Sequence, residues 1–577
     1  MKTKVLIFLL LLHYSFSFGQ LHIENNNTLY VQNQVVFVEN NVDIESGSAI
    51  SLRDEAQLIQ GNSGTSTNLG SGYLSVFQEG INSPYHYNYW CAPVGDFSTN
   101  SSGNQNFSVN MMRDEFGTSA LFTNSYEGVS SPLTISSQWL YTYDNGTVYA
   151  DWDAINESTN INPGVGFTMK GTNAVTNQRY EYRGKPNNGT INLSVLANQN
   201  RLIGNPYPSA LDADQFILDN AATITGELFF WDQWGTGSHY LSDYEGNYAT
   251  YTSSGLGMGT GIAATTPTTD YGAGGINSTN TDIKTPKRYI PIAQGFMVEG
   301  NATGGTVVIQ NSQRPKLPET FQSDYKENAG DSDFFSPSNN INYYLGKAFR
   351  FPTFIFKISV EDTYDRRLML VLRDDANSSA EYGKDAKASE TLTSDVTWLI
   401  ENESFIIQSD KFSIDKKLPL VFDIGILNDF SFSLEATEFT DNLDIRVFLH
   451  DKETGQYYEF TSFDDKFDFT LPAGRISERF EITFSEEVLS VDDTKIQSLT
   501  IFQNNASQIL NILNPNRMEL KSVTMHDILG KKLWTKKISG NQETISMDTS
   551  TLSDGIYIVS VLSQENQVLT KKVTVTN

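Results

Sequence analysis

The segment YIPIAQGFMVEG occupies residues 289–300, and a second segment, INPGVGFTMKG, occupies residues 161–171. Both run from a proline into Gly-Phe, and an apolar stretch follows. Glycine permits the positive φ of a tight turn, and an aromatic residue after it seals the edge of a sheet. The two segments therefore predict two turn-to-strand junctions, with Gly166 and Gly295 each placed just before a strand.

These junctions close two longer stretches that indicate an internal duplication. The first stretch opens with YNYWCAPVG at residues 87–95, and the second opens with LIGNPYPSALDAD at residues 202–214. In both, an apolar strand enters a proline turn, a tryptophan-bearing stretch follows, and Gly-Phe ends the unit. We therefore expect two related β-units in which Phe167 and Phe296 are buried at equivalent positions.

Alternating side chains continue beyond the duplication. Phe467, Phe469 and Leu471 face one way, and Asp468 and Thr470 face the other. This period-two alternation is typical of a strand with one buried face, and a series of such strands predicts an antiparallel sandwich. Aromatic residues make up 12% of the chain, which also suits sheets. The sequence predicts an all-β protein built from several β-sandwich-like modules in series.

Changes in composition divide the chain into expected parts. They are a signal peptide at residues 1–19, a solenoid-like segment of short strands at 20–72, two β-units at 73–188 and 189–315, a linker at 316–342, a β-sandwich at 343–484, a connector at 485–497 and a small immunoglobulin-like sandwich at 498–577. The one helix expected covers residues 210–219, with Ser209 as its N-cap and Asp212 at the third helical position.

Residues 1–19 have the composition of a secretory signal peptide. Lys2 and Lys4 precede an apolar run at residues 5–12, and small residues stand before a cleavage point ahead of Gln20. The run is too short for a membrane-spanning helix, which needs roughly 20 apolar residues. No later stretch of the sequence is long and apolar enough to form one. We expect passage through the Sec translocon into the periplasm, with no transmembrane segment and no lipid anchor.

The charge of the chain is strongly acidic and unevenly spread. The formal net charge is −28. This balance argues against nucleic acid as a partner, because a phosphate backbone requires a cationic surface. From Lys495 onward, basic residues outnumber acidic ones, which indicates a separate terminal module.

The terminal module carries the motifs of an export signal. They are HDILGKKLW at residues 526–534, STLSDGIYIVSV at 550–561 and Lys-Lys-Val at 571–573. In order and spacing they resemble the type A sorting domain of type IX secretion substrates, common in Bacteroidetes. The resemblance implies delivery by the type IX machinery to the outer cell surface or the medium. That family usually opens with Tyr-Pro-Asn-Pro, whereas this chain has IFQNN at 501–505, so the related type C signal is the alternative.

The body resembles a group of flavobacterial surface proteins of undefined activity. Besides the segments already quoted, the shared pieces are YEYRGKPNNGTI at residues 180–191, GELFFWDQW at 226–234 and DRRLMLVLRDDANSSAEYGKDAK at 365–387. The resemblance implies a common architecture and export route. It implies no reaction.

Motifs for catalysis and metal binding are absent from the sequence. The histidines that follow the signal peptide are too far apart for a zinc motif: His22, His86, His239, His450 and His526. There is no G-x-S-x-G elbow, P-loop or dinucleotide fingerprint. Cys91 is the only cysteine, and no His or Asn pattern frames it, so we expect a buried, inert thiol. The sequence predicts that the protein is not an enzyme and assigns no catalytic, cofactor-binding or metal residues.

One aromatic cluster bears on ligand binding. It lies among Gly, Ser and Asp and consists of Trp231, Trp234, Tyr240, Tyr244 and Tyr248. Exposed aromatic faces stack on sugar rings, whose C–H faces are apolar. The ordinary alternative, which we favour at this point, is that these rings fill the core or pin a loop.

One acidic loop bears on calcium. Asp374, Asp375, Glu381 and Asp385 are close in sequence, and Ca²⁺ takes six to eight oxygen ligands. Their spacing matches no EF-hand, so a solvated turn is the better interpretation.

The leading functional hypothesis is a non-catalytic surface or secreted protein that acts in adhesion or in glycan or matrix binding. A secreted polymer-degrading hydrolase is the alternative, because a catalytic set assembled from distant residues leaves no local motif. A third hypothesis is that the protein is a structural component of the cell envelope. Stable co-purification with outer-membrane partners would distinguish that component from a released protein.

Overall fold

A computed structural model describes residues 20–24, 26–61, 64–174, 178–234, 237–254, 259–267, 284–315, 351–360, 363–389, 392–438, 440, 445–486, 499–528, 530–538, 540–564 and 568–576. The chain divides into two compact units, Met1–Ser485 and Glu486–Asn577. The expected signal peptide, the linker at 316–342 and most of the connector at 485–497 lie outside the described residues.

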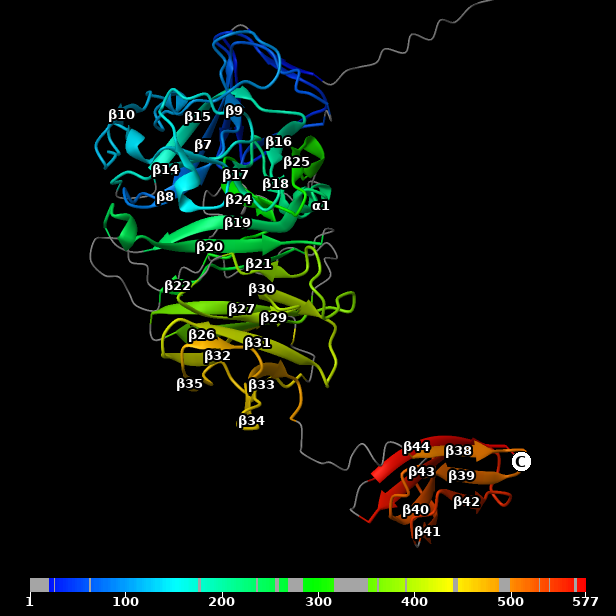
Figure 1. The fold of residues 1–577 in the computed structure, drawn as a ribbon. Helices are drawn as coiled ribbons and strands as arrows, with labels where there is room; N and C mark the ends of the chain where they lie inside the picture. Colours follow the sequence, from blue (N-terminus) through cyan, green and yellow to red (C-terminus); the bar gives the residue numbers. More distant parts are fainter. Residues whose placement is uncertain are drawn as a thin grey trace, which may run out of the picture. The chain divides into compact units, whose positions relative to one another are not determined.

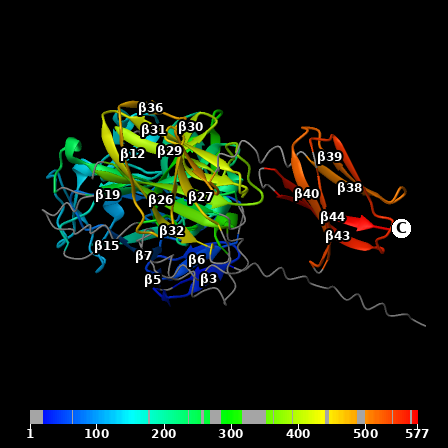
Figure 2. The ribbon, with the colours of Figure 1, turned by 90° about the horizontal axis from the view of Figure 1, so that it is seen from below.

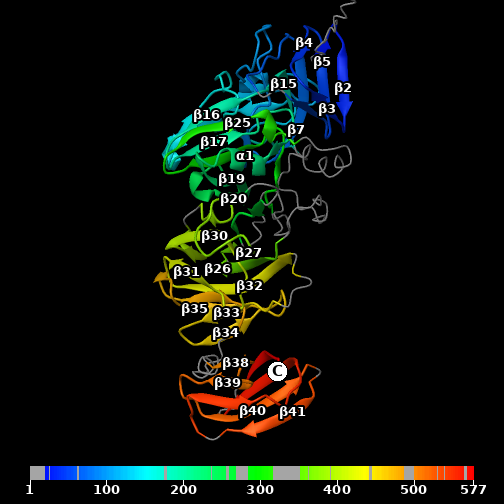
Figure 3. The ribbon, with the colours of Figure 1, turned by 90° about the vertical axis from the view of Figure 1, so that its right-hand side faces the viewer.

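The first unit begins with short strands stacked in parallel (Figure 3). They are β1 (Leu21–Ile23), β2 (Thr28–Gln32), β3 (Val35–Val38), β4 (Val42–Ile44), β5 (Ala49–Arg53), β6 (Gln57–Gln60) and β7 (Tyr73–Gly80). β1 pairs with β4, β3 with β6, and β5 with both β2 and β7. Parallel pairing requires the chain to wind round before each return, as in a solenoid. Val42, Ile50 and Leu58 are buried inside the stack.

A nine-stranded sheet forms the middle of this unit (Figure 1). Its members are β8 (Tyr87–Trp90), β12 (Tyr141–Gly146), β13 (Trp152–Ala154), β14 (Phe167–Lys170), β17 (Asn200–Gly204), β19 (Ile224–Trp234), β20 (Glu245–Thr252), β21 (Thr260–Ile262) and β24 (Gly295–Gly300). Their order is β21-β20-β19-β24-β17-β12-β14-β8, and β13 pairs with β12. Both β-units predicted from the duplication therefore contribute strands to one sheet, and the boundary between them stays a prediction.

The two Gly-Phe junctions occupy equivalent places in this sheet. β14 lies between β8 and β12, as β24 lies between β17 and β19. Phe167 pairs with Trp90 in register, and Phe296 pairs with Ile203. Both phenylalanines have an exposed fraction of 0%. Their predicted burial at matching positions is confirmed.

The junctions also exchange contacts across the sheet. Gln294 forms a bridge to Trp90, and Val165 forms the matching bridge to Ile203. The residue before each bridging residue has a positive φ, +86° at Gly164 and +65° at Ala293. The turn geometry is therefore repeated even where one copy has glycine and the other has alanine.

The helix differs from its prediction. α1 covers Ala213–Asp219, and its N-cap is Asp212, whose Oδ1 accepts a hydrogen bond of 3.1 Å from the backbone N of Asp214. The predicted start at residue 210 and the predicted cap Ser209 are wrong. Residues 211–212 are instead drawn into strand β18 (Leu211–Asp212), and the Ser209 hydroxyl accepts from Arg314 Nε at 2.7 Å. Tertiary pairing here overrides the local helix signal.

Shorter strand pairs complete the part of the first unit that precedes the sandwich. The remaining strands there are β9 (Val94–Gly95), β10 (Leu121–Thr123), β11 (Thr134–Ser136), β15 (Gln178–Pro186), β16 (Ile191–Val195), β23 (Tyr289–Ile290) and β25 (Gly305–Ile309). β15 joins the solenoid-like stack by pairing with β7 and β9. β16 pairs with β25, β18 with β23, and β10 with β11.

The rest of the first unit is the predicted sandwich. Its strands are β22 (Thr266–Pro267), β26 (Thr353–Val360), β27 (Tyr364–Leu372), β28 (Ala386–Lys387), β29 (Ser394–Ile400), β30 (Glu403–Asp410), β31 (Lys417–Ile424), β32 (Asn428–Glu438), β33 (Phe448–Asp451), β34 (Gln456–Glu459), β35 (Phe467–Leu471), β36 (Gly474–Ile476) and β37 (Phe480–Thr483). Four strands separate β31 from β32 along the sheet, yet Phe422 on β31 lies 5.3 Å from Phe430 on β32, between ring centroids. The sheet therefore folds over, and its two halves enclose one core.

The second unit is a small sandwich of its own (Figure 2). One sheet contains β38 (Thr500–Asn504), β39 (Ile509–Leu513) and β42 (Thr544–Asp548); the other contains β40 (Leu520–Asp527), β41 (Lys532–Lys537), β43 (Gly555–Ser563) and β44 (Val568–Val575). Leu510, Val523 and Val559 have no exposed surface in the core between them. The all-β prediction, with a separate C-terminal sandwich, is confirmed.

Candidate functional site

An aromatic groove lies on one face of the nine-stranded sheet. Alternation along the strands creates it, because Trp90 and Phe167 point into the core on one side whereas Tyr89 points to the other. The floor of the groove belongs to a second apolar cluster on this opposite face: Tyr89, Tyr143, Phe229 and Met297 line the cavity, and Leu202 is buried beneath them. The cavity above the floor has a volume of about 600 Å³.

Aromatic rings in the groove hold one another in place. Tyr89 stacks on Trp231 with ring centroids 6.1 Å apart and ring planes 8° apart. Trp231 meets Tyr248 edge-on at 5.2 Å, and the hydroxyls of Tyr89 and Tyr248 are hydrogen-bonded at 3.0 Å. Trp152 contacts Tyr143 at 4.8 Å. Such contacts fix the rings before any ligand arrives.

A buried lysine supports one wall of the groove. The Lys170 ammonium lies 3.8 Å from the Trp139 ring centroid, 4.5 Å from that of Tyr244 and 4.8 Å from that of Tyr87. Lys170 Nζ donates to Tyr244 Oη at 2.6 Å, and it lies 3.3 Å from His239 Nδ1. Burial lowers the pKa of Lys170 to about 7. The lysine thereby holds Tyr87 and Tyr244, which both line the groove, from behind.

Polar side chains stand at another part of the lining. Asn200 on β17 and Glu299 on β24 are paired in register, and both line the groove. Burial raises the pKa of Glu299. Behind it, burial raises the pKa of Glu227 to about 7, and the backbone N of Lys387 donates to Glu227 Oε1 at 3.4 Å.

The fold places the members of the aromatic cluster predicted from the sequence in different parts of the structure. Trp231, Tyr244 and Tyr248 line the groove. Trp234 packs against the core of the second β-unit, and Tyr240 is 77% exposed and outside the lining. The interpretation of these rings as core holds for Trp234; Trp231 and Tyr248 pack against a buried cluster and also line the groove.

Most of the groove residues lie outside the aromatic cluster predicted from the sequence. The additional aromatic residues that line it are Tyr87, Tyr89, Tyr141, Tyr143, Tyr149 and Trp152. A signal was present, since YNYW and YTYDNGTVY alternate tyrosines with polar residues, and one face of such a strand is a row of rings. The pattern does not show which strands lie next to each other in the sheet, and that pairing is what brings the rings together.

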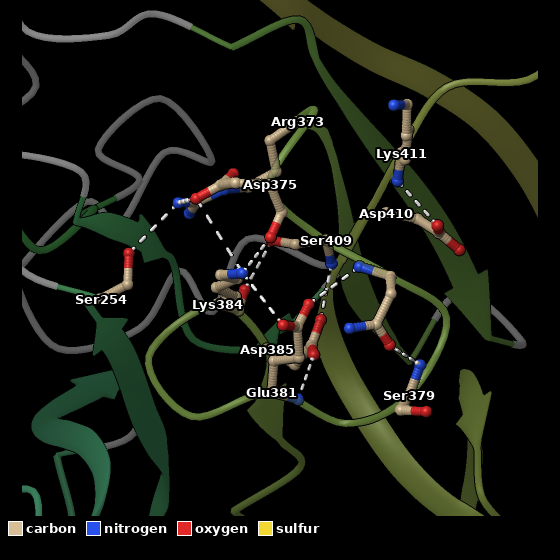
Figure 4. Close-up of polar contacts among 11 residues, drawn as sticks. Ser254, Arg373, Asp375, Ser379, Glu381, Lys384, Asp385, Ser409, Asp410 and Lys411 are labelled. Atoms are coloured by element: carbon tan, nitrogen blue, oxygen red, sulfur yellow. Dashed lines mark hydrogen bonds and ion pairs between the residues drawn. The ribbon is translucent and has the colours of Figure 1, made fainter.

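Carboxylates of the acidic loop form ion pairs and hydrogen bonds (Figure 4). Asp375 accepts from Arg373 Nε at 2.8 Å, and this hydrogen bond lowers the pKa of Asp375. Glu381 lies 3.0 Å from Lys384 Nζ. These two carboxylates are therefore paired with neighbouring cations.

The other two carboxylates of this loop also point to separate partners. Asp385 is buried and accepts from the backbone N–H groups of Glu381 and Ser409, at 2.8 and 2.6 Å. The Asp374 side chain is 98% exposed. Within the described ranges, the side chains whose ligand atoms lie close enough to share an ion are elsewhere: His22, Glu24 and Glu45.

Cys91 is buried, and its predicted burial is confirmed. Its backbone N donates to Ala293 O at 2.8 Å, and a Cβ added at Gly204 would lie 2.4 Å from the Cys91 Cβ. Burial raises the pKa of the Cys91 thiol. The close packing leaves the sulfur out of reach of solvent.

We expect native Cys91 to react with iodoacetamide on the order of 100-fold more slowly than the same thiol in urea, because little thiolate forms and none is exposed. Mass spectrometry of the alkylated protein over time measures both rates. Equal rates in the native and denatured protein would contradict the burial of this thiol.

Comparisons with known proteins fit this fold. The secretion system C-terminal sorting domain matches residues 500–576, the range of the second sandwich. The protein is thus an exported all-β type IX secretion substrate, with the cell surface or the medium as its destination. The resemblance of the tail is confirmed. The match over the body gives the family: the chain belongs to the family described as domain of unknown function DUF8693, which matches residues 11–484.

Solved structures give only weak likenesses. A DUF3244 family protein with an immunoglobulin-like β-sandwich fold, from Bacteroides vulgatus ATCC 8482, is 16% identical; the match covers 15% of this chain and 88% of that one, with a TM-score of 0.13. The central fibronectin-III array of RIM-binding protein is 8% identical, with coverage of 40% and 95% and a TM-score of 0.13. A polysaccharide lyase is 9% identical, with coverage of 39% and 40% and a TM-score of 0.12. TM-scores this low support no inference about function.

No curated protein sequence matches the chain. In the part of the chain that the structure describes, no helix combines the length and the apolar character needed to cross a membrane.

Proposed function

We propose that this protein binds glycans in the aromatic groove without cleaving them and serves adhesion or matrix contact outside the cell. The observation that carries the proposal is the groove itself, which has a volume of about 600 Å³ and an aromatic floor and walls. Tyr149 at its edge is 61% exposed. Pyranose rings present apolar C–H faces that stack on such rings, while their hydroxyls seek polar partners.

The arrangement of the rings supports binding over simple core filling. Tyr141, Tyr149 and Tyr244 line the cavity and keep exposed or half-exposed surface. The contacts among Tyr89, Trp231 and Tyr248 already restrict their rotamers. A ligand that lies on these rings therefore costs little side-chain entropy.

The proposal includes a route to the outside. Residues 1–19 act as the signal peptide for the Sec translocon, and cleavage precedes Gln20. The sorting domain then directs the chain through the type IX machinery of a Bacteroidetes-type cell. An acidic, exported body with an aromatic groove suits contact with polysaccharides of a matrix or a surface.

Tyr149→Ala is expected to weaken glycan binding about tenfold, because the lost ring contact contributes about 1–1.5 kcal/mol. Tyr240→Ala is the matched control, since Tyr240 is also largely exposed but lies outside the groove lining. A polysaccharide array probed with the mature chain identifies the ligand, and calorimetry then measures both variants. Equal losses for Tyr149→Ala and Tyr240→Ala, or no binding by the wild type, would contradict the groove as the site.

The same preparation separates binding from hydrolysis. Incubation of the mature chain with the polysaccharide it binds should leave the polymer length unchanged, as measured by size-exclusion chromatography. The release of oligosaccharides by the wild type would favour the hydrolase alternative.

A further inference from the structure

Glu299 is an isolated carboxylate in the aromatic groove. Its side chain is half-buried, and among the described residues it takes part in no hydrogen bond or ion pair. The positive charge of Lys387 acts on it from a distance, but Lys387 Nζ is itself paired with Glu403 at 2.6 Å. Buried polar groups in folded proteins are usually hydrogen-bonded to protein or to ordered water, whereas a half-buried carboxylate in a groove keeps its lone pairs open to what enters the groove. The Glu299 carboxylate is therefore free to accept hydrogen bonds from a ligand in the groove.

The Asn200 side chain lies beside Glu299 and, among the described residues, also lacks a hydrogen-bond partner. The two residues are directly opposite in the register of β17 and β24, so their Cβ atoms are separated by about 4.5–5.5 Å on one face. The Asn200 amide makes no hydrogen bond to another described residue. An acceptor-only carboxylate and an amide that both donates and accepts therefore lie side by side in the groove wall.

We propose that Asn200 and Glu299 are the polar recognition pair of the groove and that the ligand they select is a neutral glycan; this inference rests on the glycan-binding function proposed above. The Glu299 carboxylate accepts hydrogen bonds from two neighbouring hydroxyls of one sugar ring. Asn200 donates its amide hydrogen to an oxygen of the same ring or of the next one. The surrounding tyrosines contact the apolar faces of the ring.

The charge of the groove selects against acidic glycans. Its described lining contains no Lys, Arg or His, and Glu299 is its charged member. Lys170 lies behind Tyr87 and Tyr244 and does not line the cavity. A uronate or sulfate group bound here would face Glu299, with Glu227 behind it, and would find no cation as a partner.

The test compares Glu299→Gln, Asn200→Ala and wild-type mature chains on three probes: the neutral glycan identified by the array, polygalacturonate and chitosan. We expect wild-type binding to the neutral glycan and at least tenfold weaker binding to polygalacturonate. Both variants should bind the neutral glycan about tenfold more weakly at an unchanged melting temperature, because neither side chain has a described partner to lose. Glu115→Gln, an exposed glutamate outside the groove, is the control and should bind like the wild type.

The outcomes distinguish this inference from the proposed function. If Tyr149→Ala loses binding while Glu299→Gln and Asn200→Ala bind like the wild type, glycan binding stands and the recognition pair is overturned. Equal or tighter binding of polygalacturonate would overturn the selection of a neutral ligand, as would a preference for chitosan that Glu299→Gln removes. If no glycan binds the wild type, the proposed function and this inference both fail. A variant whose melting temperature falls is replaced by the other member of the pair.

Discussion

A chain that lacks residues 498–577 is expected to fold, to reach the periplasm and to be absent from both the cell surface and the medium. The sorting domain covers residues 500–576, and it forms a compact unit with a core of its own. The cores of the first unit are built entirely from residues before Ser485. Removal of the tail therefore takes away the export address without removing core side chains from the body.

Cell fractionation and protease treatment of intact cells measure the location of the truncated chain. The purified truncation should show the same main melting transition as the full chain. A fusion of a signal peptide, a carrier protein and residues 486–577 is the complementary control, and it should reach the surface. Normal display of the truncated chain would refute the role of the tail in sorting, and aggregation in the periplasm would refute its independence from the body.

Replacement of Phe296 by Ala is expected to lower the free energy of unfolding of the body by about 3–5 kcal/mol, a large share of the stability of a domain. Phe296 is fully buried, and its ring centroid lies 5.6 Å from that of Phe216 and 5.6 Å from that of Phe230. Loss of the ring leaves a cavity that the fixed strands on both sides cannot fill. Phe167→Ala should cost a similar amount, because its ring occupies the equivalent place and packs against Phe107 at 6.0 Å.

Denaturant unfolding of the mature chain, followed by tryptophan fluorescence, measures the shift of the midpoint for each variant. Phe116→Ala is the matched control, since the same atoms are removed from a side chain that is 86% exposed. That control should cost less than about 0.5 kcal/mol. A cost below about 1 kcal/mol at either Phe167 or Phe296 would show that the two junctions are not equivalent parts of the core.

Much of the fold follows from local patterns in the sequence. Gly-Phe after a proline predicted both turn-to-strand junctions and their buried rings, but the positive φ expected at Gly166 and Gly295 lies two residues earlier, at Gly164 and Ala293. Alternation at Phe467, Phe469 and Leu471 predicted a strand, which is β35. The start of helix α1 was mispredicted, because Asp212 is drawn into pairing with Tyr289, far away in the sequence.

Less of the candidate site than of the fold could be predicted from the sequence. The stretch that contains Trp231 and Tyr248 was noted, but its partner Tyr89 stands on β8, in the other copy of the duplication. The sequence also shows the acidic loop, in which Arg373 pairs with Asp375 and Lys384 with Glu381. In both cases the residue types were visible, and the contacts that decide their role were not.

By itself, the sequence determined that the chain is all-β, that it contains two equivalent Gly-Phe junctions and that the tail is an export signal. These properties depend on the alternation of neighbouring side chains and on short motifs, and both are local. The tertiary structure alone decided that the two repeats lie side by side in one sheet, with Asn200 opposite Glu299 and Tyr89 against Trp231. Strand order and register are set by contacts between residues far apart in the chain, so a groove that several strands build together appears only when those strands are paired.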